Sequence, residues 1–231
     1  MKFSAVAFDL DGTLYPDLRL YIRLVPFLLK EMRLLLAMGR ARKMLRETAP
    51  GDSELNESNK SNTGDFYEKQ AQIIAEILNK PVDKIREKID RLIYKGWEEY
   101  FKKIKLFPHV RETLDKFREK DIKLGMLSDF PPENKLEYLG LSGYWDVIAC
   151  SEVSGKLKPD PLSFLEVAGK LGTEADQVLY VGNRHSYDVA GAHRAGMKTA
   201  LIQSRFIKKP KNPVPDFVFH DYRQLQKYVL G

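Results

Sequence analysis

Short apolar runs alternate with amphipathic segments along most of the chain. The apolar runs contain β-branched and aromatic residues and predict buried strands at 2–8, 122–127, 146–150, 178–181, 198–202 and 217–219. Apolar residues at helical spacing predict helices at 110–120, 136–139, 161–171, 186–195 and 222–229. Strands that alternate with helices form right-handed βαβ units. The pattern therefore predicts an α/β fold, with a parallel sheet and helices on both of its faces.

The stretch from Tyr15 to Leu106 contains no strand pattern. It predicts helices at 18–47, 65–78 and 82–103, with a polar loop at 48–64 between the first two. An all-helical stretch that follows the first strand is typical of an inserted domain. We therefore expect two domains, a core made of residues 1–15 and 107–231 and an all-α cap made of residues 16–106.

The segment from Leu18 to Gly39 is rich in leucine but is interrupted by charged residues such as Arg19, Arg23 and Lys30. It contains no run of about 20 apolar residues, so it should not span a bilayer. Two interpretations remain. A basic amphipathic helix can lie on a membrane surface, or its apolar face can pack against its own protein, which is the interpretation we favour.

Composition adds limits on the class of protein. The 231 residues include 43% hydrophobic and 30% charged residues, which is typical of a globular domain. Cys150 is the single cysteine, so no disulfide framework or cysteine-rich metal site is possible within the chain, and a cytoplasmic location is expected. The net charge of +6 is spread among nearly as many acids, which favours a small anionic substrate over nucleic acid.

The residues after the first predicted strand carry the clearest chemistry. Asp9 and Asp11 lie two residues apart, and Gly12 allows the backbone to turn sharply. One carboxylate can attack phosphorus while the other moves a proton. An isolated Asp-x-Asp-Gly sequence would more often be only a turn.

Three further motifs follow later strands. Ser128 and Lys158 offer a hydroxyl and an ammonium group to phosphoryl oxygens, and Asn183 and Asp188 offer oxygen ligands to Mg²⁺. Each of them alone is more often structural, as an acid in the first turn of a helix is. The motifs lie at the carboxyl ends of predicted strands, where open α/β sheets bind ligands.

Taken together, the motifs FDLDGTLY, GMLSDF, KPDP and VGNRHSYDVAGAHRAGM resemble those of the haloacid dehalogenase superfamily of hydrolases. The resemblance covers almost the whole chain, with residues 15–106 in the place of the helical cap. It implies a Rossmann-like core and a Mg²⁺-dependent phosphatase that acts on a small phosphorylated metabolite. The reaction would pass through an aspartyl-phosphate on Asp9.

The resemblance also implies a role for each motif residue. Asp9 is the expected nucleophile, and Asp11 is the expected acid that protonates the leaving oxygen and later activates water. The phosphoryl group is expected to contact Gly12, Ser128, Asp129 and Lys158. The expected Mg²⁺ ligands are Asp9, Asp11, Asn183 and Asp188.

Two positions depart from the family pattern. Ser128 is followed by Asp129 where an asparagine is usual, and Gly182 by Asn183 where an aspartate is usual. If position 129 supplies mainly a backbone donor, this change matters little, although the extra charge of Asp129 could weaken phosphate binding. An amide at position 183 removes one negative charge from the metal site, so we expect weaker Mg²⁺ binding, which Asn183→Asp should restore. Whether Asn183 or Asp188 binds the ion directly remains open.

Several alternatives stay open at this point. A 2-haloacid dehalogenase has the same fold but typically lacks the second acid, which is present here as Asp11. A sugar-phosphate mutase would need cap residues that we cannot identify, and Asn183 is the main argument for a non-catalytic phospho-ligand binding protein. A monomer and a homodimer are both compatible with the sequence.

The cap carries no pattern that names a substrate. Basic residues such as Arg40, Arg42 and Lys43 could attract a second anionic group, although a solvated face is the favoured interpretation. Trp97 and Tyr100 lie at helical spacing and are expected in the core of the cap.

Overall fold

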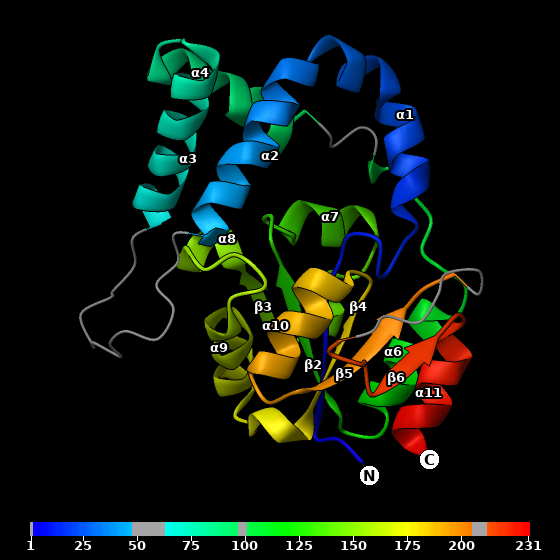
Figure 1. Ribbon diagram of the computed structural model, residues 1–231. Helices are drawn as coiled ribbons and strands as arrows, with labels where there is room; N and C mark the ends of the chain where they lie inside the picture. The colour runs from blue at the N-terminus through cyan, green and yellow to red at the C-terminus, as the bar shows by residue number, and fades with distance from the viewer. Residues whose placement is uncertain (1, 48–62, 97–100, 205–211) are drawn as a thin grey trace.

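The computed structural model describes residues 2–47, 63–96, 101–204 and 212–231. Its core is a parallel sheet of six strands in the order β3-β2-β1-β4-β5-β6 (Figure 1). The strands are β1 (Ala5–Phe8), β2 (Lys123–Ser128), β3 (Val147–Cys150), β4 (Val178–Gly182), β5 (Lys198–Ile202) and β6 (Phe217–Phe219). This arrangement confirms the predicted α/β, Rossmann-like class. The strand order reverses beside β1, which is where such sheets bind ligands.

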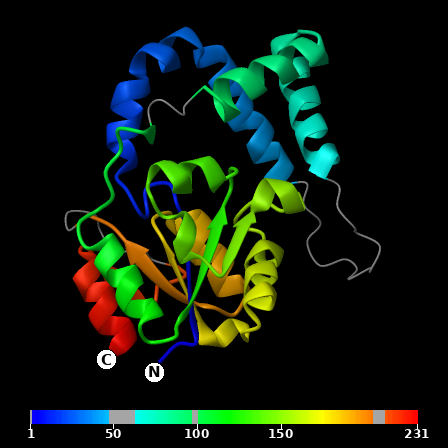
Figure 2. The same ribbon diagram turned by 180° about the vertical axis from the view of Figure 1, so that it is seen from behind.

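Helices cover both faces of the sheet, as the alternation along β1 requires. Val6 and Phe8 pack on one face with residues of α6 and α11, whereas Ala5 and Ala7 pack on the other with residues of α9 and α10. Figure 2 shows helices on both faces of the sheet. The core helices are α6 (Val110–Arg118), α7 (Glu133–Tyr138), α8 (Ser151–Ser154), α9 (Pro161–Leu171), α10 (Ala190–Arg194) and α11 (Tyr222–Leu230). Short helical turns are η2 (Ser142–Tyr144), η3 (Ala175–Gln177) and η4 (His185–Val189).

Helix α9 shows how local sequence sets these bounds. The Asp160 carboxylate accepts a hydrogen bond of 2.9 Å from the Leu162 amide, and Pro161 occupies the first turn, where it needs no donor. Gly172 ends the helix with φ 60°, a left-handed conformation that glycine adopts without strain. The helix therefore begins and ends at the predicted residues.

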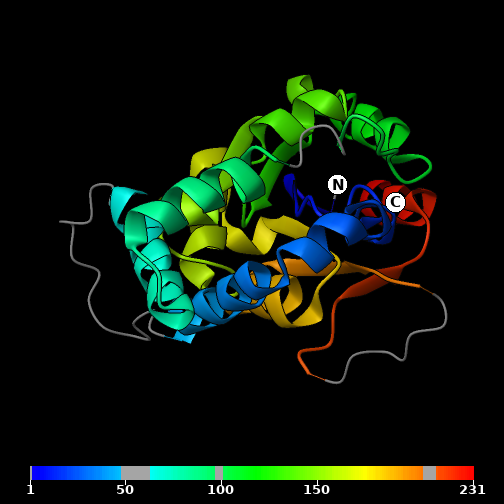
Figure 3. The same cartoon turned by 90° about the horizontal axis from the view of Figure 1, so that it is seen from above.

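The predicted insertion forms a separate group of helices above the carboxyl ends of the strands (Figures 1 and 3). They are α1 (Asp17–Lys30), α2 (Met32–Glu47), α3 (Thr63–Leu78), α4 (Val82–Ile89) and η1 (Asp90–Tyr94). They share their own apolar cluster, which includes Leu34, Ala41 and Ile74. We refer to this group as the cap; the exact domain bounds stay a prediction.

Two predicted cap helices differ in the structure. The single helix expected at 18–47 is broken at Glu31, where φ is −109° and α1 ends. The helix expected at 82–103 ends at Tyr94. Residues 48–62 of the predicted loop, and Trp97 with Tyr100, lie outside the described residues.

The outer surface of α1 and α2 is partly apolar. Leu24 and Leu34 are buried, as expected for helices that pack on their own protein, but Ile22, Leu29 and Leu36 are exposed. Within the described chain, no helix is both long and apolar enough to cross a bilayer. Association with a membrane surface stays a prediction.

Candidate active site

The central strand carries the predicted nucleophile to the edge of the sheet beneath the cap. In the register of the sheet, Phe8 pairs with Met126 of β2 and with Val181 of β4, so the three strands end at one level. Asp9 follows Phe8 directly, and its amide donates to the Val181 carbonyl at 2.9 Å. The motif residues at the ends of β1, β2 and β4 are therefore neighbours, as the sequence predicted.

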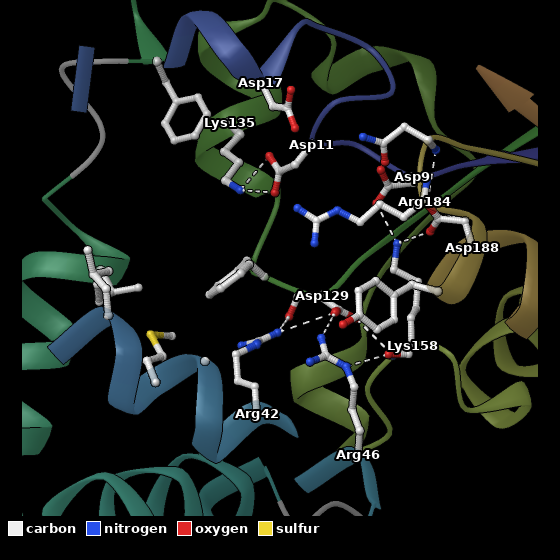
Figure 4. Close-up of a pocket in the computed structure, with 18 residues that line it drawn as sticks. Asp9, Asp11, Asp17, Arg42, Arg46, Asp129, Lys135, Lys158, Arg184 and Asp188 are labelled. Atoms are coloured by element: carbon white, nitrogen blue, oxygen red, sulfur yellow. Dashed lines mark hydrogen bonds and ion pairs between the residues drawn. The ribbon is translucent and has the colours of Figure 1, made fainter. Parts of the chain in front are cut away.

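Lys158 joins the first and last motifs. Its Nζ lies 2.6 Å from Asp9 Oδ1 and 2.8 Å from Asp188 Oδ1, and the residue is only 3% exposed (Figure 4). Burial alone would lower the pKa of Lys158, but the carboxylates of Asp188 and Asp9 outweigh it and hold the pKa well above its usual value. The site therefore contains a permanently charged ammonium between two acids.

Asp9 is held by both of its oxygens. Thr13 Oγ1 donates to Asp9 Oδ2 at 2.7 Å, and Lys158 binds the other oxygen. The pKa of Asp9 is raised to about 7. Burial is the main cause, Lys158 lowers the pKa, and Asp188 adds to the rise. These contacts fix one orientation of the carboxylate, which is what a nucleophile needs.

Asp11 is in a different environment. Lys135 of α7 contacts both of its oxygens, at 2.9 and 2.7 Å, and the Tyr15 hydroxyl donates to Oδ1. Burial favours a higher pKa, but Lys135 and the hydrogen bond from Tyr15 overcome it and hold the pKa of Asp11 below its usual value. The pKa values of the two acids are thus shifted in opposite directions, upward for Asp9 and downward for Asp11.

Ser128 ends β2, and Gly12 follows Asp11 in the loop after β1. Ser128 is 1% exposed, and its Oγ accepts a hydrogen bond of 3.2 Å from the Phe130 amide, which leaves its proton to donate elsewhere. Gly12 has φ 82°, and a Cβ there would lie 2.0 Å from Asn183 Nδ2. The glycine therefore makes room for the Asn183 side chain.

The oxygen atoms around Asn183 fit a small hard cation. Asn183 Oδ1 is buried and, among the described residues, has no hydrogen-bond partner. By contrast, Asp188 Oδ1 binds Lys158, and its Oδ2 accepts from the amides of Asn183 and Arg184 at 3.1 and 2.9 Å. In the described chain no three His, Cys, Asp or Glu side chains are grouped to hold a metal. The candidate donors are therefore amide and main-chain oxygens together with Asp9.

The cap reaches this edge of the sheet through two arginines of α2. Arg46 Nη2 lies 2.8 Å from Asp129 Oδ2, and its Nε donates to the Lys158 carbonyl at 2.7 Å. Arg42 is 6% exposed and pairs with Glu152, which is fully buried. Arg42 is therefore not on a solvated face, and its charge is already matched by an acid.

The Arg42–Glu152 pair is expected to contribute strongly to stability. In an Arg42→Ala protein, Glu152 keeps a buried charge without its cation, so the free energy of unfolding should fall by about 3–5 kcal/mol. Urea denaturation measures this change. Lys43→Ala is the matched control, because Lys43 is 75% exposed in its pair with Glu47, and it should change stability by less than about 1 kcal/mol. Equal changes in both variants would contradict the prediction.

A cavity of about 370 Å³ lies between the cap and the strand ends. Asp9, Asp11, Lys158 and Asp188 line its floor from the core. The cap contributes Arg42 and Arg46 together with apolar residues, namely Leu35, Met38 and Ile93. The cavity is therefore charged around Asp9 and partly apolar on the side of the cap.

Several residues of this site were not among the predicted ones. Thr13 was visible within FDLDGTLY, four residues after Asp9. Lys135, Glu152 and the pairing of Arg46 with Asp129 had no sequence signal, because the partners are 83 to 124 residues apart. His185 follows the last motif strand closely in sequence, and its Nε2 lies 2.7 Å from the Pro213 carbonyl.

Comparisons with known proteins agree with this geometry. Residues 3–196 match the family model of haloacid dehalogenase-like hydrolases. The chain is 35% identical to a glyceraldehyde 3-phosphate phosphatase of Methanopyrus kandleri over 136 residues, which are 56% of this chain and 58% of that enzyme. It is 32% identical to a phosphoglycolate phosphatase of Aquifex aeolicus over 151 residues, 64% of this chain and 70% of that enzyme. The chain thus spans little more than half of the first of these relatives.

A solved structure shares the fold over the full length. The HAD phosphatase of Thermococcus onnurineus superposes with a TM-score of 0.64 at 21% identity, and the match covers 99% of this chain and 98% of that one. At this level of identity, the likeness concerns the fold alone.

Proposed function

The chain belongs to the haloacid dehalogenase-like hydrolase family, and we propose that it is a phosphatase that hydrolyses small phosphorylated metabolites through Asp9. The family match confirms the resemblance seen in the sequence motifs. The proposal rests above all on one observation, the buried cluster in which Lys158 lies between Asp9 and Asp188. The names of the two phosphatase relatives support the substrate class.

In the first half of the reaction, an Asp9 oxygen attacks phosphorus and the bond to the leaving oxygen breaks. Thr13 and Lys158 hold the carboxylate in one orientation, so little rotation is needed before attack. Lys158 and the Ser128 hydroxyl can both donate to phosphoryl oxygens. Since phosphoryl transfer needs positioning and charge neutralisation more than covalent help, a fixed ammonium suits this step.

Asp11 is the group proposed to move protons. It must hold a proton to release the leaving alcohol, and the negative charge of a bound phosphoryl group favours its protonation. In the second half, Asp11 accepts a proton from the water that attacks the aspartyl-phosphate. Lys135 and Tyr15 fix the direction of its carboxyl group through both halves.

Mg²⁺ is the cofactor that we propose for this site. Asp9, the Asp11 carbonyl and Asn183 Oδ1 would hold it, and the lack of a partner for the buried amide oxygen supports this assignment. When bound, the ion supplies positive charge that neutralises the phosphoryl oxygens. A role for Asp188 as a direct ligand stays a prediction. Its Oδ1 accepts from Lys158, and its Oδ2 accepts from main-chain amides.

The amide at position 183 should make Mg²⁺ binding weak. In Asn183→Asp, a carboxylate replaces the neutral ligand, so the dissociation constant should fall by about tenfold, about 1.4 kcal/mol. Isothermal calorimetry with MgCl₂ measures this without turnover. Asp160→Asn is a control that changes an acid outside the cavity and should leave the affinity unaltered. Equal Mg²⁺ affinity in the wild type and Asn183→Asp would argue against position 183 as a ligand.

A panel of phosphomonoesters tests the function directly. We expect release of inorganic phosphate from at least one small phosphomonoester of the panel with Mg²⁺, and its loss with a chelator. The Asp9→Asn protein serves as the blank. A full panel without hydrolysis, in a folded protein that still binds phosphate, would instead favour a non-catalytic phospho-ligand binding protein.

Two other activities of the same fold fit the site less well than a phosphatase. A 2-haloacid dehalogenase is disfavoured by Asp11, which is held beside Asp9 in the same cavity. A sugar-phosphate mutase stays an alternative that the same panel tests, because it would yield an isomeric phosphate rather than free phosphate. We further propose a cytoplasmic enzyme, monomeric or homodimeric, with no nucleic-acid partner.

A further inference from the structure

Two arginines of the cap face the substrate cavity, yet both are already bound by acids of the core. Arg46 pairs with Asp129 at 2.8 Å (Figure 4), and Arg42 pairs with Glu152. Arginines at this position would ordinarily offer a bidentate site for a carboxylate or phosphate of the substrate. Here, the protein's own carboxylates bind the two arginines in place of a substrate anion.

Asp129 is fixed firmly enough to keep Arg46 occupied. Its Oδ1 accepts hydrogen bonds from Ser151 Oγ at 2.6 Å and from the Lys158 amide at 3.1 Å, while Oδ2 faces Arg46. Burial favours a higher pKa, but Lys158, Arg42 and Arg46 hold the pKa of Asp129 below its usual value, so it stays ionised. A second substrate anion would have to displace a carboxylate that three partners hold.

Charge is balanced over the whole cavity. Among the described residues, five carboxylates and five cationic side chains line it, all labelled in Figure 4. A phosphate dianion together with a divalent cation would leave this balance unchanged. If the leaving group carried a further negative charge, the cavity would have no excess positive charge to pair with it. The free-energy cost of removing that charge from water would then not be offset.

The rest of the lining fits an uncharged group. Leu35, Met38, Ile93, Phe101 and Phe130 face the cavity from the cap and from the loop after β2. The Cζ atom of Arg42 lies over the Phe130 ring, 4.1 Å from its centroid, so the ring covers the guanidinium further.

Resting on the proposed phosphatase function, we propose that Asp129 and Glu152 are specificity-determining residues. By neutralising Arg46 and Arg42, they make the site select phosphomonoesters whose leaving alcohol carries no negative charge. Selectivity of this kind arises from the penalty on the wrong substrate rather than from added contacts with the right one. The inference also gives Asp129 a function at a position where the family usually has asparagine.

A matched pair of substrates tests the proposal. The compounds 2-hydroxyethyl phosphate and 2-phosphoglycolate differ only in an alcohol against a carboxylate on the leaving group. We expect the wild-type kcat/KM to be at least tenfold higher for 2-hydroxyethyl phosphate. This comparison requires no variant. Equal or better hydrolysis of 2-phosphoglycolate would overturn the inference and leave the phosphatase function intact, whereas hydrolysis of neither, nor of any panel compound, would contradict the proposed function.

The Asp129→Asn protein tests the mechanism of selection. Asparagine keeps the shape and can still accept hydrogen bonds from Ser151 and Lys158, but it no longer neutralises Arg46. The ratio of kcat/KM values should shift toward 2-phosphoglycolate by about tenfold. Glu166→Gln removes a carboxylate from an exposed pair with Lys170 and should leave the ratio unchanged. An unaltered ratio in Asp129→Asn would contradict the proposal.

Discussion

Replacing Asp9 with asparagine should lower kcat/KM by roughly a thousandfold or more, because the amide cannot form the covalent intermediate. The substitution keeps the side-chain shape, and the Thr13 hydroxyl can still donate to its oxygen. Release of phosphate from the best panel substrate measures the effect. Wild-type rates in Asp9→Asn would rule out Asp9 as the nucleophile.

The Asp9→Asn protein is expected to stay folded, so the loss of activity should not result from unfolding. Burial raises the pKa of Asp9 from 3.8 to about 7, so the folded protein binds a proton there that the unfolded chain has lost by pH 7. The contribution of this carboxyl to stability therefore falls as the pH rises between about 4 and 7. Asparagine stays neutral, so at pH 8 without metal Asp9→Asn should be at least as stable as the wild type. Thermal unfolding checks this.

The second large effect is expected at Lys158. Lys158→Met removes the cation between Asp9 and Asp188 and should lower kcat/KM by about a hundredfold to a thousandfold. It also leaves two buried carboxylates facing each other, so the free energy of unfolding should fall by about 3–5 kcal/mol. Activity assays and urea denaturation at pH 8 measure the two effects.

A double variant separates these two effects. In Lys158→Met with Asp188→Asn, one of the unpaired charges is gone, and stability should recover while activity stays low. The surface control Lys170→Met, whose lysine is 54% exposed, should change neither quantity appreciably. Recovery of activity together with stability would show that Lys158 serves the fold rather than the reaction.

The core of the fold was predictable because its local signals agree. The apolar run of β1 is followed at once by Asp and Gly, and α9 is bounded by Asp160-Pro161 and Gly172. The hydrophobic pattern and the turn and capping residues therefore predict the same ends for these elements. The break between α1 and α2 was not predictable in this way. Around Glu31 the residues Lys, Glu, Met and Arg all favour helix, and no glycine or proline marks the end of α1.

The site residues that directly follow strands were predictable from the sequence. The contacts made by residues on helices were not. Asp9 and Ser128 could be expected at one edge, because parallel strands end together. Lys135 and Arg46 have no such constraint, since each lies on a helix that can pack at many angles. The role of Asp129 was the main surprise, because its extra charge, which could have weakened phosphate binding, is neutralised by Arg46.

The hydrogen bonds of Arg46 also affect the timing of catalysis. Arg46 bonds to the Asp129 carboxylate and to the main chain of Lys158, so any movement of α2 away from the sheet would break both hydrogen bonds. Each such bond contributes on the order of 1 kcal/mol or more. We therefore expect the resting enzyme to be shut, with departure of inorganic phosphate as the slow event in each cycle.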